Sequence, residues 1–367
     1  MIQDMIVYLT YILLALVYLL LTGVILTWVE RKQGAIMADR IGANRAYIRI
    51  PFTNIKFVAW GLFHAMADGG KMLLKENFMP NTHDKLIYRI APWATFTPVL
   101  LAFAVIPFGG KLTINDTTYD MQISNLDGGI LVILAISGLS VIGSILAGWS
   151  SNNKFSLMGS IRAASQMISY EIALGLAVLS MILVFHTLNL GDMARAQSSI
   201  LWGYLPAWGI IKAPLAALLF MIAAIAENKR APFDLPEAES ELIAGYFTEY
   251  TGMKMGLFMF AEFIEIAVIS AVFVTIFLGG YNLPFMSDAG FMFPGSHEIA
   301  ISHYLVVAIQ LITFIVKVLM VSSFQVQVRW TLPRFRYDQL LQFGWKLLLP
   351  LGVFNLMVTV LILWLTN

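Results

Sequence analysis

The chain alternates long apolar runs with polar connections, a pattern that predicts a bundle of membrane-spanning helices. A helix needs roughly 20 mostly apolar residues to cross a bilayer. Eight runs meet this requirement, at about 5–28, 91–109, 129–148, 166–186, 205–226, 255–278, 303–326 and 346–366. Since no repeat of solenoid or propeller period is present, we expect an all-α integral membrane protein that forms one membrane domain over residues 1–367.

Two segments refine this pattern. The first run lacks a basic leading region and a small-residue cleavage pattern, so we expect a retained helix rather than a signal peptide. The first connection holds a shorter apolar stretch at about 54–74, which Lys56, Trp60, His64 and Lys71 interrupt or flank. Because this stretch is too short to span, it predicts an amphipathic helix that lies in the membrane interface.

The distribution of basic residues predicts the orientation. Nineteen of the 23 lysines and arginines lie in the odd-numbered connections, and only Lys111 and Arg195 lie in the even-numbered ones. Cytoplasmic loops are enriched in Lys and Arg. We therefore expect both termini outside, with the long first connection and the fifth connection, about 227–254, on the cytoplasmic side of a bacterial inner membrane.

The composition limits the chemistry of the chain. Hydrophobic residues make up 59% of the 367 and charged residues 12%, against roughly 45–50% and about 25% in soluble domains. There is no cysteine, which excludes disulfides and thiolate-bound clusters. A membrane haem needs paired histidines within spans, and none of the five histidines lies mid-span. We expect this chain to bind no metal and no redox cofactor of its own.

Ionisable residues within the predicted spans are candidates for function, because a charge at mid-membrane costs at least about 2.5–3.5 kcal/mol and faces the bundle interior. They are Glu171, Lys212, Glu262, Glu265 and Lys317. Glu262 and Glu265 share a helix face and lie on the order of 12–16 Å deep, and Lys317 is expected at a comparable depth. These residues either neutralise one another in ion pairs that fix helix packing or form a hydrated pathway. The excess of carboxylates favours the pathway.

The fifth connection is unusually acidic for a cytoplasmic loop. Its carboxylates are Glu227, Asp234, Glu237, Glu239, Glu241 and Glu249. Asp234 and Glu237 have the spacing of a capping box, with Pro236 in the first turn, and this predicts a helix over about 235–250.

The helix macrodipole is a sufficient explanation for the two carboxylates near its start, Glu237 and Glu239. Neither the helix dipole nor solvation explains why carboxylates are placed at Glu227, Glu241 and Glu249. Carboxylates gathered in this way suit groups that take up and pass on protons near neutral pH.

Several motifs, taken in order along the chain, resemble one known family. They are VERKQGAIMADRIGAN, ADGGKMLLKE, QMISYEIALGL, ENKRAPFDLPEAESELIAGYFTEYTGMKMGLFMFAEF and RWTLPRFRYDQLLQFGWKLLLP. Over essentially its whole length the chain resembles the H subunit, also known as the subunit 1 or chain 8 type, of respiratory NADH:quinone oxidoreductase (complex I). The departures are small: Ala43 replaces a common proline, His64 a common glutamine, and ENKR the commoner ETNR.

The resemblance implies a membrane subunit that forms the quinone tunnel beneath two peripheral-arm subunits, the 49-kDa type and the terminal iron–sulfur type. Small membrane subunits and antiporter-like subunits would be further partners, and nucleic acid would not. Ubiquinone or menaquinone would be the substrate, with electrons from FMN and iron–sulfur clusters held only by the partners. This chain would contribute no directly catalytic residue.

The resemblance also assigns roles to residues of this chain. Quinone-tunnel candidates are Arg31, Lys32, Arg40, Asp68, Lys71 and Phe233. Together with the residues found above, the proton and charge path comprises Glu30, Asp68, Glu171, Glu227, Asp234, Glu237, Glu239, Glu241, Glu249, Glu262, Glu265 and Lys317. Phe233 has an alternative interpretation as an interface anchor. Arg31, Lys32 and Arg40 have another, as positive-inside anchors at the end of a span.

The implied function is to couple quinone reduction to proton pumping within a multisubunit translocase. One alternative is the matching component of a membrane-bound hydrogenase-type complex. Another is a stand-alone cation/proton antiporter, which would need inverted repeats with broken helices, and the sequence displays neither. A third is a structural anchor for the peripheral arm, in which neutralising the buried carboxylates would leave activity unchanged.

Overall fold

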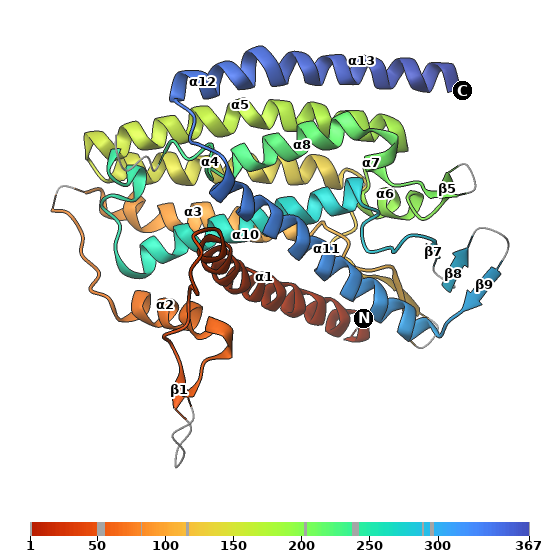
Figure 1. The fold of residues 1–367 in the computed structure, drawn as a ribbon, viewed down its shortest axis with the longest axis horizontal. Helices are drawn as coiled ribbons and strands as arrows, with labels where there is room; N and C mark the ends of the chain where they lie inside the picture. Colours follow the sequence, from red (N-terminus) through yellow and green to blue (C-terminus); the bar gives the residue numbers. More distant parts are fainter. Residues whose placement is uncertain are drawn as a thin grey trace.

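The computed structural model describes residues 2–49, 56–81, 83–114, 117–201, 204–236, 242–287, 290–293 and 297–366, which fold mainly into long helices (Figure 1). The longest are α1 (Ile2–Met37), α3 (Lys85–Phe103), α4 (Gly129–Ser150), α5 (Lys154–Phe185), α10 (Gly252–Phe277) and α11 (His303–Thr331), followed by α12 (Tyr337–Gln342), a π-helical turn (Phe343–Leu348) and α13 (Leu349–Thr366). Seven of the described helices are long and apolar enough to cross a membrane, counting α12 to α13 as one. The predicted fold class is confirmed.

The predicted span at 205–226 is interrupted. It comprises α7 (Gly209–Lys212) and the 14-residue α8 (Pro214–Glu227). Pro214 lacks a backbone N–H and disfavours helical geometry in the residue before it, and Ala213 has ψ of 72°. Because α8 alone is short for a span, the count of eight and the outward N-terminus stay predictions. Both chain ends do lie toward the same side of the bundle (Figure 1), as an even number of crossings requires.

Several helices extend past the apolar runs that predict them. α1 continues from the predicted end at Trp28 to Met37, and α5 begins at Lys154 rather than near 166. The Asn153 side chain starts α5 by accepting a hydrogen bond from the Phe155 backbone N–H at 3.0 Å. Hydropathy detects the apolar part of a helix, whereas hydrogen bonding and caps determine its ends. Residues Glu30 to Lys32 are therefore helical.

Short antiparallel strands join the helices. In the first connection, β1 (Ile48–Arg49) pairs with β2 (Lys56–Phe57). The others are β3 (Lys111–Ile114) with β4 (Thr117–Asp120), β5 (Ile200–Leu201) with β6 (Leu205–Pro206), and β7 (Met286–Ser287) with β8 (Gly290–Phe293) and β9 (His297–Ala300). Strands β5 to β9 and the short α6 (Leu190–Ala196) lie at the end of the bundle opposite to α2 (Phe63–Leu74) (Figure 1).

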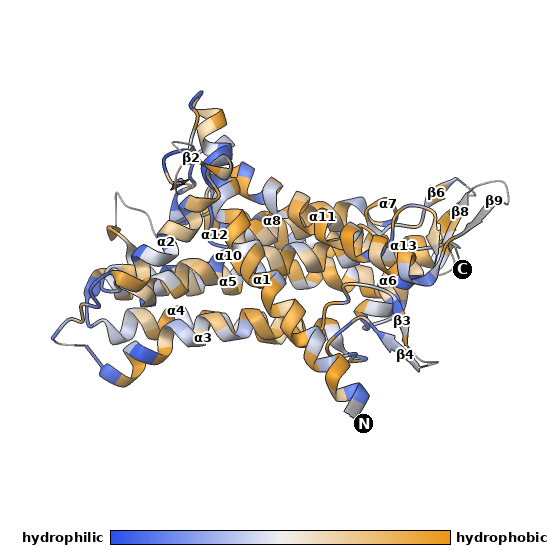
Figure 2. Ribbon diagram, turned by 90° about the horizontal axis from the view of Figure 1, so that it is seen from below, coloured by the Kyte–Doolittle hydropathy of each residue, from blue (hydrophilic) through white to orange (hydrophobic). Residues whose placement is uncertain are grey.

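Helix α10 forms the centre of the bundle. Every residue from Ala261 to Phe277 is buried, as expected for a helix that is apolar on all sides, and α10 contacts α1, α3, α8 and α11. The outer helices instead leave apolar side chains uncovered; Met357 on α13 is 64% exposed. Hydrophobic residues dominate the long helices and polar ones gather near the ends and connections (Figure 2). The centre of the bundle is thus the place where a buried charge needs a partner.

The two predicted connection helices have different outcomes. The stretch at 54–74 forms a 3₁₀ turn (Ala59–Gly61) and α2, none of whose residues is buried, while Asn54 and Ile55 lie outside the described residues. The predicted helix over 235–250 is wrong in its second half: within residues 242–250 only Leu242 is α-helical, and turns with one 3₁₀ turn (Gly245–Phe247) follow it.

Aromatic packing explains this departure from the predicted helix. Tyr246, Phe247 and Tyr250 are buried in one cluster with Tyr88 of α3 and Phe258 of α10. The rings of Tyr88 and Tyr250 are stacked 4.2 Å apart. Tertiary contacts of large side chains override the local pattern here, and they hold the end of the fifth connection against the bundle.

Candidate functional site

A buried ion-pair group joins three distant parts of the chain near the end of the bundle that carries α2. The Arg230 Nη1 donates a hydrogen bond to Glu30 Oε2 at 2.9 Å. Arg329, near the end of α11, pairs with the other oxygen of Glu30. The side chains of Arg230 and Glu30 are only 11% and 13% exposed, so neither charge is solvated well and each depends on the other.

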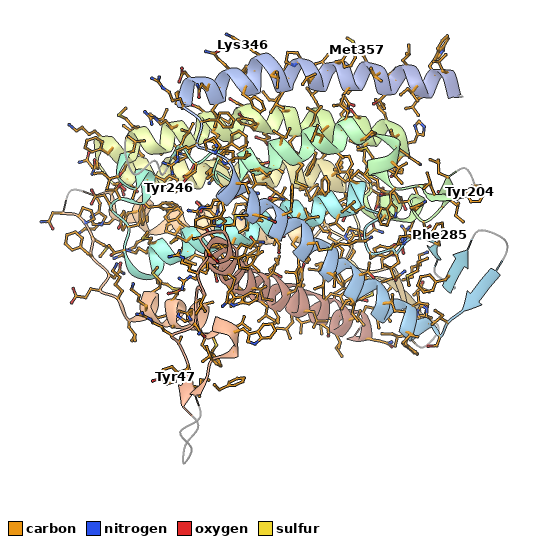
Figure 3. All side chains as sticks on the ribbon, viewed as in Figure 1. Tyr47, Tyr204, Tyr246, Phe285, Lys346 and Met357 are labelled. Carbon is orange, nitrogen blue, oxygen red and sulfur yellow. The ribbon has the colours of Figure 1, made fainter. Side chains whose placement is uncertain are left out.

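Arg230 also reaches the central helix. Its Nη2 lies 3.9 Å from Glu262 Oε2, and its guanidinium lies 4.3 Å from the centre of the Phe263 ring. The Tyr246 hydroxyl donates to Glu262 Oε1 at 3.2 Å. Figure 3 places Tyr246 at the end of the bundle opposite to Tyr204 and Phe285. Glu262 thus links α10 both to the segment after α8 and to the 3₁₀ turn of the fifth connection.

Three more buried charges lie beside this group: Glu227 at the end of α8, Lys229 after it and Glu265 on α10. Each residue is less than 5% exposed. Lys229 is two residues after Glu227, and its Nζ lies 5.7 Å from the ring of Tyr246, the hydrogen-bond partner of Glu262. A carboxylate at the C-terminus of a helix opposes the macrodipole, so the placement of Glu227 is not a helix-stabilising device. We call Glu30, Glu227, Lys229, Arg230, Glu262 and Glu265 the charge network.

Uncharged polar side chains continue from the charge network between α10 and α11. Asn228 donates to Gln325 at 2.8 Å, and Gln325 donates to the Ser270 hydroxyl at 3.1 Å. All three are buried. Such a string of polar groups in a membrane bundle gives protons and water more polar contacts than apolar walls would.

Asp234 and Phe233 hold the segment after α8 against the stretch before α13. Asp234 pairs with Arg334 at 3.0 Å. Burial raises the pKa of Asp234 against the opposing effect of Arg334, Arg329 and Arg230. Phe233 is 5% exposed and its ring stacks on Phe335 at 5.4 Å. These contacts favour the anchor interpretation of Phe233 over a tunnel-lining role.

The other tunnel candidates lie at the surface between α1 and α2. Arg31 pairs with Asp68, and their side chains are 44% and 41% exposed. Lys32 donates to the Ile41 carbonyl at 3.2 Å, and Arg40 and Lys71 are exposed. The structure thus gathers five of the six predicted tunnel residues at one place and separates Phe233 from them.

The remaining path candidates are dispersed. Glu171 on α5 is half-buried and faces Gly138 of α4, where an added Cβ would lie 3.0 Å from its Oε1. Glu249 accepts a hydrogen bond from Asn153 at 2.6 Å, away from the charge network. Glu237, Glu239 and Glu241 lie outside the described residues. The capping role predicted for Asp234 is replaced, among the described groups, by its pair with Arg334.

The predicted depth of Lys317 is wrong. Its Nζ donates to the carbonyls of Leu278, Gly280 and Asn282 at 2.6, 3.1 and 2.6 Å. These residues follow the far end of α10, thirteen or more positions after Glu265, which corresponds to about 20 Å along a helix. Lys317 therefore donates hydrogen bonds to carbonyls at and after the C-terminus of α10 that lack helical partners. It lies apart from Glu262 and Glu265.

The remaining intramembrane lysine, Lys212, is also separate from them. It is the last residue of α7, and its Nζ lies 4.7 Å from the centre of the Phe185 ring. Among the described residues, His, Asp and Glu form no group of three that could hold a metal ion.

Comparison with known proteins identifies the family. A family profile described as NADH dehydrogenase matches residues 9–360. The chain belongs to the NADH dehydrogenase family. This membership confirms the resemblance found in the sequence motifs. The matched range includes every residue of the charge network.

Individual relatives of the NADH dehydrogenase family match over nearly their full lengths. A protein of Flavobacterium psychrophilum is 41% identical over 91% of this chain and 90% of its own. One from Leptospira biflexa is 41% identical over 94% and 92%, and one from Syntrophotalea carbinolica is 39% identical over 96% of both. All three are named as the H subunit of NADH-quinone oxidoreductase.

In this family member, sequence reasoning missed the cations of the site. The sequence predicted only a positive-inside role for Arg230 and Arg329, although both pair with Glu30. It predicted no role for Tyr246. One signal was present: Lys229 and Arg230 lie directly between Glu227 and Asp234, which favours mutual neutralisation within a single loop. Nothing in the sequence indicates that Arg329, 299 positions after Glu30, completes the group.

Replacing Lys317 by methionine is expected to destabilise the protein without altering any proton-dependent property. The three carbonyls would lose hydrogen bonds to a charged donor, each worth about 1.5–3 kcal/mol. Thermal denaturation of the assembled complex should show a lowered midpoint, with the pH dependence of activity unchanged. A displaced pH dependence at unchanged stability would instead place Lys317 in the charge path.

Proposed function

We propose that this chain is the membrane subunit of a proton-translocating NADH:quinone oxidoreductase, and that its charge network couples quinone reduction to proton transfer. The names of its relatives support membership of such a multisubunit complex. The chemistry of the buried side chains is that of acids and bases rather than of electron carriers. Electrons would come from FMN and iron–sulfur clusters of the peripheral-arm partners, namely the 49-kDa-type and terminal iron–sulfur subunits.

One observation carries the proposal: a route of charged side chains leads from the surface to the central helix. Asp68 pairs with Arg31 at the surface. The preceding residue on α1 is Glu30. Because consecutive residues of a helix lie about 100° apart, its side chain points inward, where it pairs with Arg230. Arg230 in turn approaches Glu262. Three of these links are ion pairs within 4 Å, and Arg31 and Glu30 are neighbours in the chain, so a charge that appears at one end changes the energy of the next group.

Quinone would enter between α1 and α2. The uncovered apolar side chains there, Trp60 and Met66, are 82% and 68% exposed and suit an isoprenoid tail or a partner's surface. The cations Arg31, Lys32, Arg40 and Lys71 suit a headgroup whose oxygens gain negative charge on reduction. Ubiquinone and menaquinone both have this chemistry. The peripheral-arm subunits would cover the first connection and supply the electrons.

Reduction would then act on the charge network through Arg230. Negative charge near Arg31 and Asp68 changes the balance at Glu30, and Arg230 lies 2.9 Å from Glu30 and 3.9 Å from Glu262. A small displacement of Arg230 toward either carboxylate changes which of them is neutralised. Glu262 would exchange a proton in response, with Glu265, Glu227 and Glu171 next along the path toward the antiporter-like subunits. Asp234 and the carboxylates at 237, 239, 241 and 249 would connect this path to the cytoplasmic side.

Neutralising Glu262 tests the proposal. In membranes that carry Glu262→Gln, the NADH-to-quinone rate should fall at least about tenfold, because a positioned acid–base group contributes a factor of this order or more. The NADH-to-ferricyanide rate, normalised to assembled complex, should persist because ferricyanide accepts electrons before the quinone site.

The matched control is Asp192→Asn, which neutralises a carboxylate in an exposed ion pair at the other end of the bundle. Its two rates should both equal the wild type. If Glu262→Gln also leaves both rates unchanged, the buried carboxylates are structural and this chain is an anchor for the peripheral arm. Membranes with no NADH activity even for the native chain would favour a hydrogenase-type complex.

A further inference from the structure

Lys229 is an unusually placed cation. It follows the end of α8 with φ of 53°, is 3% exposed, and its Nζ makes no hydrogen bond to a described group. The Tyr246 ring lies 5.7 Å away, which offers a weak cation–π contact. A buried ammonium is costly unless an opposite charge compensates it. Lys229 must therefore derive its stabilisation from nearby carboxylates rather than from hydrogen bonds to the backbone.

Comparison with Lys317 separates two uses of a lysine in this bundle. Lys317 donates to three carbonyls and so fixes the end of α10. Lys229 holds no carbonyl among the described groups, so fixing the backbone does not explain why an ammonium is buried there. Its three N–H groups are free of described partners and remain available to the carboxylates around it or to water.

Glu265 is the matching anion. It is 4% exposed, and its Oε2 also lacks a described hydrogen-bond partner. The neighbouring Glu262 already has Tyr246 and Arg230, and Arg230 already has Glu30. Glu265 and Glu227 are therefore the carboxylates of the charge network left without an arginine among the described contacts. Glu227 is two residues before Lys229, and Glu265 lies one helical turn after Glu262, whose partner Tyr246 has its ring 5.7 Å from the Lys229 Nζ.

Other titratable groups lie on each of the elements that meet at the charge network. Its own segment carries Glu227, Arg230 and Asp234; α10 carries Glu262 and Glu265; the 3₁₀ turn carries Tyr246; and α5, α1 and α11 carry Glu171, Glu30 and Arg329. The arginines are committed to Glu30, Glu262 and Asp234 by ion pairs or by proximity. Lys229 is the cation in this set that no described ion pair occupies.

We propose that Lys229 is a positioning residue that sets the proton occupancy of the charge network, with Glu265 as its principal counter-charge. This inference deepens the proposed function and rests on it. A positive charge among Glu227, Glu262 and Glu265 favours their ionised forms, while Glu265 opposes this effect. The pair thereby fixes the pH range in which the path can both accept and release a proton.

The test is the pH dependence of NADH-to-quinone activity in the assembled complex. Lys229→Met should move the ionisation midpoint of the pH–rate profile upward by about one pH unit or more, because loss of a nearby cation favours protonated carboxylates. Lys229→Arg should keep the wild-type midpoint. Glu265→Gln should move it downward, and the double variant Lys229→Met with Glu265→Gln should return it toward the wild type.

The outcomes distinguish this inference from the proposed function. The role of Lys229 is overturned if Lys229→Met has the wild-type midpoint. It is overturned equally if Lys229→Met and the double variant have the same midpoint. If Lys229→Met alone does not assemble, the double variant, which buries neither charge, is compared with Glu265→Gln; identical midpoints again overturn it. Loss of quinone reduction in Glu262→Gln combined with no effect of Lys229 refutes only this inference. A wild-type rate of quinone reduction in Glu262→Gln refutes the proposed function itself.

Discussion

Replacing Arg230 by methionine is expected to lower the amount of assembled complex severalfold and to abolish quinone reduction in what remains. The substitution keeps a long apolar stem but removes the arginine that approaches Glu262 and deprives Glu30 of one of its two arginines. Removing one partner of a buried ion pair costs about 3–5 kcal/mol, because the remaining charge stays buried and uncompensated. Thermal denaturation of the complex and its yield in membranes measure this effect.

Two companion variants make the Arg230 experiment specific. Arg195→Met removes an arginine whose side chain is 33% exposed and pairs with Asp120 and Asp192, so it should cost about 1 kcal/mol or less. Adding Glu262→Gln to Arg230→Met removes the orphaned charge and should recover part of the stability but no quinone reduction. Wild-type stability of Arg230→Met would contradict the ion-pair network.

Substituting valine for Gly159 is expected to separate α5 from the turn that carries Tyr246. A Cβ at Gly159 would lie 2.7 Å from the Gly245 Cα and 3.0 Å from the Tyr246 nitrogen. These atoms belong to the backbone and cannot rotate away, so overpacking should cost at least about 2 kcal/mol. Because Tyr246 donates to Glu262, the displacement should also weaken quinone reduction. Both the denaturation midpoint and the quinone rate report it.

Gly175, on the same helix, provides the control. An added Cβ there meets nothing within 4 Å, and alanine is the better helix former. Gly175→Ala should therefore match or slightly exceed the wild type in stability and activity. If Gly159→Val behaves like Gly175→Ala, the close approach of α5 to the 3₁₀ turn does not exist in the assembled complex.

The sequence predicts the helices well because each depends on a local apolar run. The run at 129–148 corresponds to α4 and that at 255–278 to α10 almost residue for residue. Helix ends are predicted less well, since α1 continues through Glu30 and Arg31 although these residues are charged. The break before α8 was visible in principle, because Pro214 is incompatible with a continuous helix.

The candidate site is predicted only in part, because its contacts join residues far apart in the chain. The buried carboxylates Glu227, Glu262 and Glu265 stand out by their apolar surroundings. Their partners do not, since Arg230 is 200 positions away from Glu30 and no local pattern encodes that pair. Lys317 illustrates the opposite error: its place within a span suggested a carboxylate partner, whereas three backbone carbonyls accept hydrogen bonds from its ammonium group.

Proton translocation by the purified complex in sealed vesicles tests the central claim most directly. With Glu262→Gln, the rate of proton translocation and the rate of quinone reduction should both fall by at least about tenfold. Ferricyanide reduction should continue at the wild-type rate. This result would place the charge network on the coupling path. Wild-type proton translocation with wild-type quinone reduction in Glu262→Gln would contradict it.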